Sequence, residues 1–286
     1  MRKLILAAAL AATTLTAGTL QAKEAPTAGT RDVEMWRLEC GGIHLADGAT
    51  FSDTHLFDGQ PRALAGSCYL IRHGDDYLLW DTGLPKSLIG APTSEHGVSL
   101  SLESSIVDQL AQIGVDPKAI SKVAVSHYHF DHTSQLPDFP NATLLISEKD
   151  WEVVNSREEG IPYLVRSAFD PWLGQGAGKV ETIAKDHDVF GDGSVLIKAT
   201  PGHTPGHNSL LVRLPKTGDV LLTGDLYHFQ EQAFAHSVPQ YNYSRVLTLS
   251  SMSRFDETAK VLNAKVVIQH DPGHVARLPA FPKSAQ

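Results

Sequence analysis

Residues 126–132, SHYHFDH, hold four side chains of the kinds that bind metal ions. They follow AISKVAV, a short apolar run that predicts a buried strand. Alternate side chains of an extended segment share one face, so His127 and His129 can point the same way. Asp131 and His132 follow as the chain turns. Neutral imidazoles and carboxylates suit zinc and similar divalent ions. A polar loop without metal is the alternative, but this density of ligands favours a metal site.

Further ligands come directly after three other apolar strands. His203 follows SVLIKAT, Asp225 follows DVLL, and His270 follows VVIQ. Strand ends that converge at one edge of a sandwich build a site from residues distant in sequence. The pattern therefore predicts two metal ions, one held by His127, His129 and His203, the other by Asp131, His132 and His270, with Asp225 as a bridge.

The stretch LLTGDLYHF, residues 221–229, places Tyr227 and His228 just after the predicted bridge Asp225. A strand that ends in a polar turn would by itself explain this composition. Beside a metal site, however, either side chain could donate a hydrogen bond to a bound substrate.

Two halves of the chain, each with strands and helices, are expected to position these ligands. In the first half, strands are predicted at 33–45, 67–83 (a hairpin turning at HGDD), 119–127 and 142–147, and helices at 101–117 and 148–159. In the second half, strands are predicted at 180–184, 188–200, 207–215, 219–225 and 264–271, and a helix at 243–262. No segment after residue 31 reads as a linker. Residues 31–286 are therefore expected to form one domain, an α/β sandwich with helices on its outer faces.

The N-terminus is typical of a secretory signal peptide, residues 1–22, followed by a flexible linker at 23–30. Arg2 and Lys3 precede an apolar stretch, and small residues lead to a cleavage site after Ala22. An N-terminal core helix is the alternative. The apolar stretch is too short to span a bilayer, and no other segment is long enough, so no stable membrane anchor is expected after cleavage. The predicted location is periplasmic or secreted.

The composition bears on the class of binding partner and on the state of the cysteines. The 286 residues include 24 Lys and Arg against 32 Asp and Glu, a formal charge of −8, which argues against a nucleic-acid-binding surface. The two cysteines, Cys40 and Cys68, lie in strand-like runs that could be neighbours. A disulfide is allowed in an exported protein, and two buried free thiols fit equally well.

The order HxHxDH, His, Asp, His resembles the metallo-β-lactamase superfamily, and the resemblance covers about residues 31–282. DTG at 81–83 also matches, where the family carries an aspartate close to the metals. The resemblance implies an αββα four-layer sandwich, which agrees with the expected strands and helices. One such scaffold hosts many reactions, so the substrate needs separate arguments.

Within that superfamily the residues favour a bridged dinuclear hydrolase. His129 stands where oxygen-reducing di-iron members use Glu, and Asp225 stands where some β-lactamases carry Cys or no ligand. GDLYHF, QHDP and the loop FSDTHLF at 51–57 resemble the exported branch of the N-acyl-homoserine lactonases, which act in quorum quenching. Cytosolic lactonases have a Tyr three residues after the bridging aspartate. Here that position is His228, and Tyr227 is one residue short.

The resemblance implies an enzyme with two Zn²⁺ ions, for which Co, Mn or Fe could substitute. Two divalent ions that share a water give a bridging hydroxide, which would attack the lactone carbonyl. A hydrogen bond from His228 or Tyr227 would stabilise the carbonyl oxygen. Asp131 would orient the nucleophile or carry its proton to the leaving group. The expected activity is therefore that of a zinc-dependent carboxylic ester hydrolase.

Supporting residues are less specific. Asp81, His207 and Asp271 are candidates for orienting the metal-binding imidazoles, although ordinary turn or core hydrogen bonding explains them equally well. A groove for an acyl chain could be lined by large apolar side chains, which at such positions more often pack in the core. These side chains are Trp36, Phe51, Leu56, Phe57, Trp151, Phe169 and Trp172.

Two other functions stay open. One is a periplasmic metallo-β-lactamase-like hydrolase that acts on lactams or other esters. The other is a non-catalytic binding protein that has kept the scaffold, which the complete ligand set argues against. A small-molecule lactone is the expected partner, and the sequence leaves open whether the chain forms a homodimer.

Overall fold

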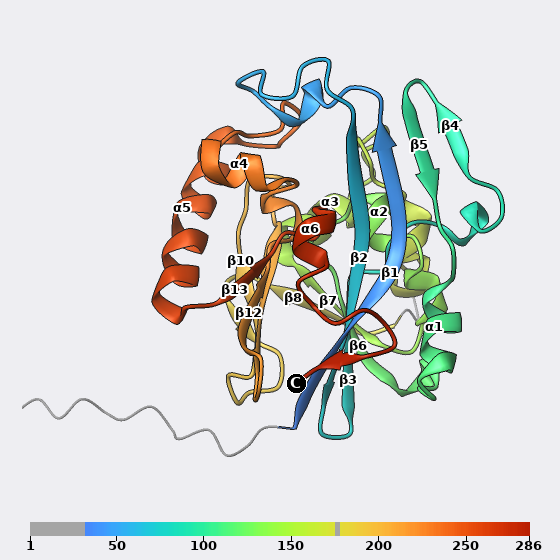
Figure 1. Ribbon diagram of the computed structural model, residues 1–286. Coiled ribbons are helices and arrows are strands. Elements are labelled where there is room, and N and C mark those ends of the chain that lie inside the picture. The colour runs from blue at the N-terminus through green and yellow to red at the C-terminus, as the bar shows by residue number, and fades with distance from the viewer. Residues whose placement is uncertain (1–31, 175–177) are drawn as a thin grey trace, which may run out of the picture.

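The computed structural model describes residues 32–174 and 178–286. The predicted signal peptide at 1–22 and the linker at 23–30 lie outside the described residues. Two sheets face each other, and helices cover the outer face of each (Figure 1). The predicted αββα sandwich is confirmed.

The first sheet has the strand order β4-β5-β1-β2-β3-β6-β7-β8 within the described chain, and β14 pairs with β1. The pairs from β3 through β6 and β7 to β8 are parallel. The strands of this sheet are β1 (Val33–Leu45), β2 (Arg62–His73), β3 (Asp76–Trp80), β4 (Thr93–Glu95), β5 (Val98–Ser101), β6 (Ile120–Ala124), β7 (Thr143–Ser147), β8 (Val180–Ile183) and β14 (Ser284–Ala285).

The second sheet has the order β13-β12-β11-β10-β9 over the same described residues. Only the β12–β13 pair among them is parallel. The strands are β9 (His187–Asp188), β10 (Val195–Ala199), β11 (Asn208–Leu214), β12 (Gly218–Leu222) and β13 (Lys265–Val267).

The α-helices are α1 (Ile106–Gln112), α2 (Phe130–Thr133), α3 (Glu148–Asn155), α4 (Gln230–Ala235), α5 (Arg245–Leu262) and α6 (Pro272–Val275). In Figure 1, α1 lies on the side of the first sheet, and α4 and α5 lie on the side of the second, whereas α3 contacts β7 and β8 of the first sheet. Within the described residues, none of these helices combines the length and apolarity that a membrane crossing requires.

Alternation along the strands separates the core into layers. In β2, Tyr69 and Ile71 pack between the two sheets, whereas Leu70 packs on the helix side of the first sheet. In β12, Val220 and Leu222 face the space between the sheets and Leu221 faces α5. Because both faces of these strands are covered, their sequences read as continuous apolar runs.

Five strands end at the edge where the predicted ligands lie. β3 and β6 run parallel in the first sheet. In the second sheet β12 and β13 are parallel, and β10 shares their direction because β11 is antiparallel to both β10 and β12. The carboxyl ends of the strands in such sheets are the usual place for a ligand site. The chain leaving each of these five strands carries the residues described below.

Several predicted elements differ in the structure. The strand predicted at 188–200 is divided into β9 and β10, and the helix predicted at 148–159 ends at Asn155. The helix predicted at 101–117 is shorter, because Ser105 caps it and accepts a hydrogen bond from the Asp108 amide. The preceding residues form the β4–β5 hairpin instead. Its turn residues His96 and Gly97 both have positive φ, 50° and 80°, as a two-residue hairpin of the favoured hand requires.

Cys40 and Cys68 form a disulfide between β1 and β2, with their Cα atoms 5.8 Å apart. Cys40 lies where the β1–β2 register shifts. Its carbonyl accepts a hydrogen bond from the Leu84 amide at 3.0 Å. Both cysteines are fully buried. Of the two arrangements that the sequence allowed, the structure has the disulfide, and it lies directly behind the turn at residues 81–84.

Candidate metal centre

The loop after β6 delivers the HxHxDH ligands to two places. The chain is extended at His129, with φ −67° and ψ 151°, and α2 begins at the next residue. His127 and His129 therefore leave the extended part, while Asp131 and His132 leave the first turn of α2. This change of backbone conformation separates four neighbouring residues into two pairs.

The first cluster consists of His127, His129, His203 and Asp225, whose ligand atoms all lie within 4.8 Å of one another. His203 Nε2 lies 3.1 Å from His129 Nδ1. All four side chains are buried. His203 follows β10, so the cluster joins the first sheet to the second.

The second cluster consists of Asp131, His132, His270 and again Asp225, within the same 4.8 Å limit. His132 Nε2 lies 3.2 Å from His270 Nε2. The Asp131 carboxylate lies 3.7 Å from His132 and 3.6 Å from His270, and its side chain is 14% exposed. The second cluster is therefore open on the side of Asp131.

Asp225 belongs to both clusters and offers one oxygen to each. Its Oδ2 lies 3.3 Å from His203 Nε2 and 3.6 Å from His127 Nε2. Its Oδ1 lies 3.1 Å from His132 Nε2 and 3.0 Å from His270 Nε2. This is the geometry of a carboxylate that bridges two cations.

The turn that presents Asp225 depends on Gly224 and His207. Gly224 has φ +55°, and a Cβ there would lie 2.6 Å from His207 Nε2. The same imidazole nitrogen accepts a hydrogen bond from the Asp225 amide at 2.8 Å. Glycine is therefore required immediately before the bridge, and His207 fixes the bridge through its backbone.

The residues present fit divalent metal ions. His127 Nε2 is buried without a hydrogen-bond partner among the described residues, and buried Asp225 Oδ1 faces only the imidazole nitrogens of His132 and His270, which are themselves predicted ligands. Burying polar atoms that lack donors or acceptors is costly, so the convergence of these ligand atoms indicates a cation-binding site. Nitrogen and carboxylate ligands in two sets of four are the donors that zinc and related ions prefer.

Each cluster is braced from behind by other polar groups. Asp81, held at φ 60° after β3, places Oδ2 3.0 Å from His132 Nδ1. Its Oδ1 accepts the Ser126 amide at 2.7 Å. In the first cluster, His203 Nδ1 lies 2.8 Å from Asn242 Oδ1. Such contacts fix the orientation and tautomer of metal-binding imidazoles.

Asp150, in the first turn of α3, ties together the two loops that form the first cluster. Its Oδ1 accepts the Gly206 amide and its Oδ2 the Thr204 hydroxyl, both at 2.7 Å. It also accepts a backbone hydrogen bond from Tyr128. The sequence analysis did not identify Asp150. The signal that could have found it is its position three residues after Ser147, the cap residue of α3.

Burial controls the protonation of the first cluster. It lowers the pKa of His129 to about 3 and lowers the pKa values of His127 and His203 well below their ordinary value. The imidazoles are therefore neutral, which is the form that binds metal.

Charge controls the second cluster. Burial opposes the charged form of His132, but the carboxylates of Asp225, Asp131 and Asp81 outweigh it and raise the pKa of His132 well above its ordinary value. Burial also opposes ionisation of Asp225, and the surrounding imidazoles, His132 foremost, hold its pKa well below the usual range. Positive charge is thus stabilised at this position.

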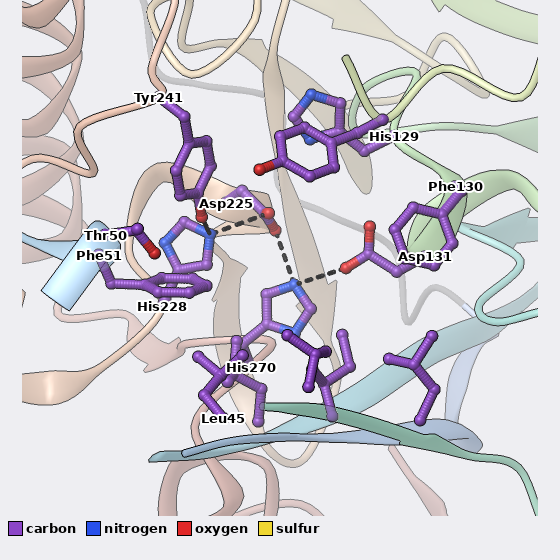
Figure 2. Close-up of a pocket in the computed structure, with 15 residues that line it drawn as sticks. Leu45, Thr50, Phe51, His129, Phe130, Asp131, Asp225, His228, Tyr241 and His270 are labelled. Carbon is purple, nitrogen blue, oxygen red and sulfur yellow. Dashed lines mark hydrogen bonds and ion pairs between the residues drawn. The ribbon is translucent and has the colours of Figure 1, made fainter. Parts of the chain in front are cut away.

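A cavity of about 200 Å³ opens onto the clusters. Figure 2 shows Asp131, His270, His228 and Asp225 around it, with Tyr241 reaching in toward Asp225. The rest of the wall is mostly apolar and comes from β1, β2, β5 and the turn at Ala49–Phe51. Tyr241 and Tyr163, which both line the cavity, come from irregular segments and were not predicted.

Two of the predicted site residues lie elsewhere. Tyr227 does not line the cavity: its ring packs beneath α5 and its hydroxyl donates to Asp256 Oδ1 at 3.0 Å. The prediction of Tyr227 as a hydrogen-bond donor to substrate is therefore wrong, because its side chain lies away from the cavity.

His228, the other candidate donor, does line the cavity, with Nε2 3.0 Å from Asp225 Oδ2. Asp271 caps α6 and accepts from the Gln230 amide, so it orients none of the clustered imidazoles.

The predicted apolar groove is also corrected in most of its members. Phe51 lines the cavity, as the sequence suggested. The remaining candidates pack in or against the hydrophobic core and do not reach the cavity. They are Leu56 and Phe57 beside the turn at 49–51, and Trp36, Trp151, Phe169 and Trp172 on the helix side of the first sheet.

Comparisons with known proteins agree with this site. Residues 61–270 match the metallo-beta-lactamase superfamily. The N-acyl homoserine lactonase AttM of Agrobacterium fabrum (strain C58) is 34% identical over 230 residues, which cover 75% of this chain and 85% of that protein. An N-acyl homoserine lactonase of a Bacillus species is 30% identical over 250 residues, 85% of this chain and 95% of that one.

A solved structure is similar over nearly its whole length. It is an N-acyl homoserine lactone hydrolase with the product N-hexanoyl-L-homoserine bound at its catalytic metal center. It is 26% identical, has a TM-score of 0.73, and the match covers 88% of this chain and 98% of that one. The chain belongs to the metallo-beta-lactamase superfamily and has a His/Asp dimetal site of the N-acyl homoserine lactonase type.

Proposed function

We propose that the protein is a dinuclear zinc hydrolase that opens the lactone ring of N-acyl-homoserine lactones. The observation that carries the proposal is a single cavity with two unlike walls. One wall holds Asp131, Asp225 and His270 of the metal clusters, and the other is built from aliphatic and aromatic side chains. A ligand with a polar ring and an apolar tail matches such a cavity.

The apolar wall fits an acyl chain. Ile43 and Leu45 of β1, Leu64 of β2 and Leu100 of β5 face the cavity, and Phe51 closes one side. Burying one methylene group is worth about 0.8 kcal/mol, so a chain along this wall would gain affinity with its length. The named relatives act on, or have bound, molecules with this combination of parts.

The metals, when bound, would supply Lewis acidity and an acidified water. The side chains of this protein do the rest. Asp131 borders both the second cluster and the cavity, so its carboxylate can accept the proton that the attacking water loses. The same carboxylate can then give that proton to the ring oxygen as the C–O bond breaks. The product is the ring-opened N-acyl-homoserine.

The test is a set of N-acyl-homoserine lactones of increasing acyl length, assayed beside a cephalosporin on protein of measured metal content. We expect about two zinc ions per chain, as a bridged site requires. Lactone opening, followed as proton release and as the mass gain of one water, should have a KM that falls as the acyl chain lengthens. Turnover of the cephalosporin alone would contradict the lactonase proposal. A metal content below about one ion per chain would favour a binding protein.

We also propose export to the periplasm or medium. The basic and apolar pattern of residues 1–22 supports it, as does the buried Cys40–Cys68 disulfide, since disulfides persist in oxidising compartments. N-terminal sequencing of the protein from a fractionated host should give Lys23 as the first residue. Full-length protein found only in the cytosol would contradict this.

A further inference from the structure

Tyr241 reaches the metal centre from the segment between α4 and α5, which no motif marks. Figure 2 shows its ring pointing into the cavity toward Asp225 and His228. Its hydroxyl lies 3.4 Å from His228 Nε2. Among the described residues this imidazole nitrogen is the one polar atom that contacts the hydroxyl.

The position of Tyr241 is fixed from both sides. Before it, the Gln240 amide donates to the Thr50 carbonyl at 2.9 Å. After it, the Tyr243 amide donates to the carbonyl of His203 at 3.0 Å. The chain thus joins the turn at 49–51 to a ligand of the first cluster, and Tyr241 lies between these two anchors.

Neighbouring rings restrict the side chain as well. The Tyr241 ring makes edge contacts with Phe51 at 5.4 Å and with Tyr163 at 5.6 Å between ring centroids. A hydroxyl held in this way is preorganised, so it loses little freedom when a substrate arrives.

The direction of the protons distinguishes Tyr241 from His228. In the bridging position that its two oxygens occupy, Asp225 acts as a carboxylate, which only accepts hydrogen bonds, so His228 Nε2, 3.0 Å away, is the donor to its Oδ2. The Tyr241 oxygen faces the same N–H from 3.4 Å, as a second acceptor. Its own hydrogen therefore points elsewhere and is free for a ligand in the cavity.

The other two candidates lack a free proton in the cavity. His228 Nε2 is engaged by Asp225 at 3.0 Å, and its Nδ1 is buried without a partner among the described residues. The Tyr227 hydroxyl is engaged by Asp256 beneath α5. Neither can donate to a substrate carbonyl without breaking a contact that the structure holds.

We propose that the Tyr241 hydroxyl donates the hydrogen bond that stabilises the carbonyl oxygen as water adds to the lactone. His228 is then a positioning residue that orients both Asp225 and the Tyr241 oxygen. The inference rests on the proposed lactonase function. The hydrogen-bond donor to the carbonyl oxygen would then come from the α4–α5 segment, and not from residue 227 or 228 as the sequence suggested.

The test is Tyr241→Phe in the metal-loaded protein. We expect kcat for lactone opening to fall by roughly ten- to a thousandfold, the effect of removing one such donor. KM and zinc content should stay within about twofold, since the ring and its contacts remain. Tyr243→Phe, two residues later with an exposed side chain, is the matched control and should keep wild-type kcat.

The outcomes separate this inference from the function on which it rests. Unchanged kcat in Tyr241→Phe, beside a wild type that opens lactones, would overturn the role of Tyr241 and leave the proposed function standing. Loss of kcat in Tyr163→Phe instead would assign the donor to the neighbouring tyrosine and would also overturn it. A wild type that opens no lactone would overturn both.

Discussion

The two metal clusters share Asp225 but are built on different physical principles. The first takes three imidazoles and no carboxylate of its own, and every member is buried. The second adds the partly exposed Asp131, and the carboxylate of Asp81 stands behind His132. In the first cluster, exclusion of water keeps the imidazoles neutral and able to bind metal. In the second, the negative charge of the carboxylates stabilises a bound cation.

This difference decides which groups each cluster depends on. Neutral imidazoles in a dry site bind a cation through nitrogen lone pairs, so their orientation matters most. In the second cluster, the carboxylates also offset the repulsion between two nearby cations. Changes to charge should therefore weaken the second cluster more than the first, and changes to the shared carboxylate should affect both.

The largest effect is expected from Asp225→Asn. An amide has one oxygen able to bind a cation, where the carboxylate has one for each cluster, and it carries no charge to hold two cations together. We expect metal content to fall from about two ions to about one per chain, and kcat to fall by about a hundredfold or more. Elemental analysis after gel filtration and the lactone assay measure both.

The matched control is Asp219→Asn, on the strand β12 that leads to the bridge. Asp219 lies 3.9 Å from Arg213 and away from both clusters, so its loss should leave metal content and kcat unchanged. If Asp225→Asn still binds two ions as firmly as the wild type, the carboxylate is not a bridge and the two clusters are independent.

The second prediction compares Asp81→Asn with Asn242→Ala. An amide at position 81 would place an N–H toward His132 Nδ1 and favour the tautomer that cannot bind metal through Nε2. We expect about a 10- to 100-fold loss of affinity for one of the two ions. Removing Asn242 takes a neutral acceptor from His203, for which water can substitute, so its effect should be at most about tenfold.

Titration with a chelator compares the metal affinities of these two variants directly. Asp81→Asn should release one ion at a chelator concentration at which Asn242→Ala and the wild type keep both. The opposite order, with Asn242→Ala losing metal first, would show that orientation and not charge dominates in both clusters.

The ligands could be predicted from the sequence because each follows an apolar strand directly. A strand end fixes where the next few side chains lie, and strands of like direction end at one edge. His203, Asp225 and His270 were found in this way. Tyr241 and Asp150 were not, because Tyr241 is held by a turn and Asp150 by contacts between loops, and neither leaves a periodic pattern.

The positions of some side chains were predicted wrongly for a related reason. Tyr227 and His228 are adjacent, and only the short turn at Gly224–Leu226 decides which of them faces the cavity. Composition likewise could not distinguish Phe51, in the cavity wall, from Phe57, which is fully buried beside it. A cavity wall and a core position both favour an aromatic residue, since the side chain removes apolar surface from water in either position.

The first cluster has its own counterpart of Asp81 in Asp150, and the two carboxylates differ in what they face. Asp81 faces an imidazole, which can share positive charge with it. Asp150 faces only the neutral donors of Tyr128, Thr204 and Gly206. Burial therefore raises the pKa of Asp150 to about 7 in spite of these hydrogen bonds.

The smallest effect on the metal centre is expected from Asp150→Asn, which should instead change the stability of the fold in a pH-dependent way. Because the folded pKa lies near 7 and the unfolded value near 3.9, the folded state holds an extra proton between about pH 4 and pH 7. Wild-type stability is thus lost as pH rises through this window, and an amide, which does not ionise, avoids the loss. Relative to wild type, the variant should gain up to about 4 kcal/mol between about pH 4 and pH 8.

Urea unfolding of both proteins across this range measures the difference, in which any loss of metal common to the two cancels. Asp75→Asn, at an exposed carboxylate in the β2–β3 turn, is the control and should show no such trend. A difference independent of pH would mean that Asp150 stays ionised when folded. The first cluster would then be supported by buried charge as the second is, and the contrast between the two would fail.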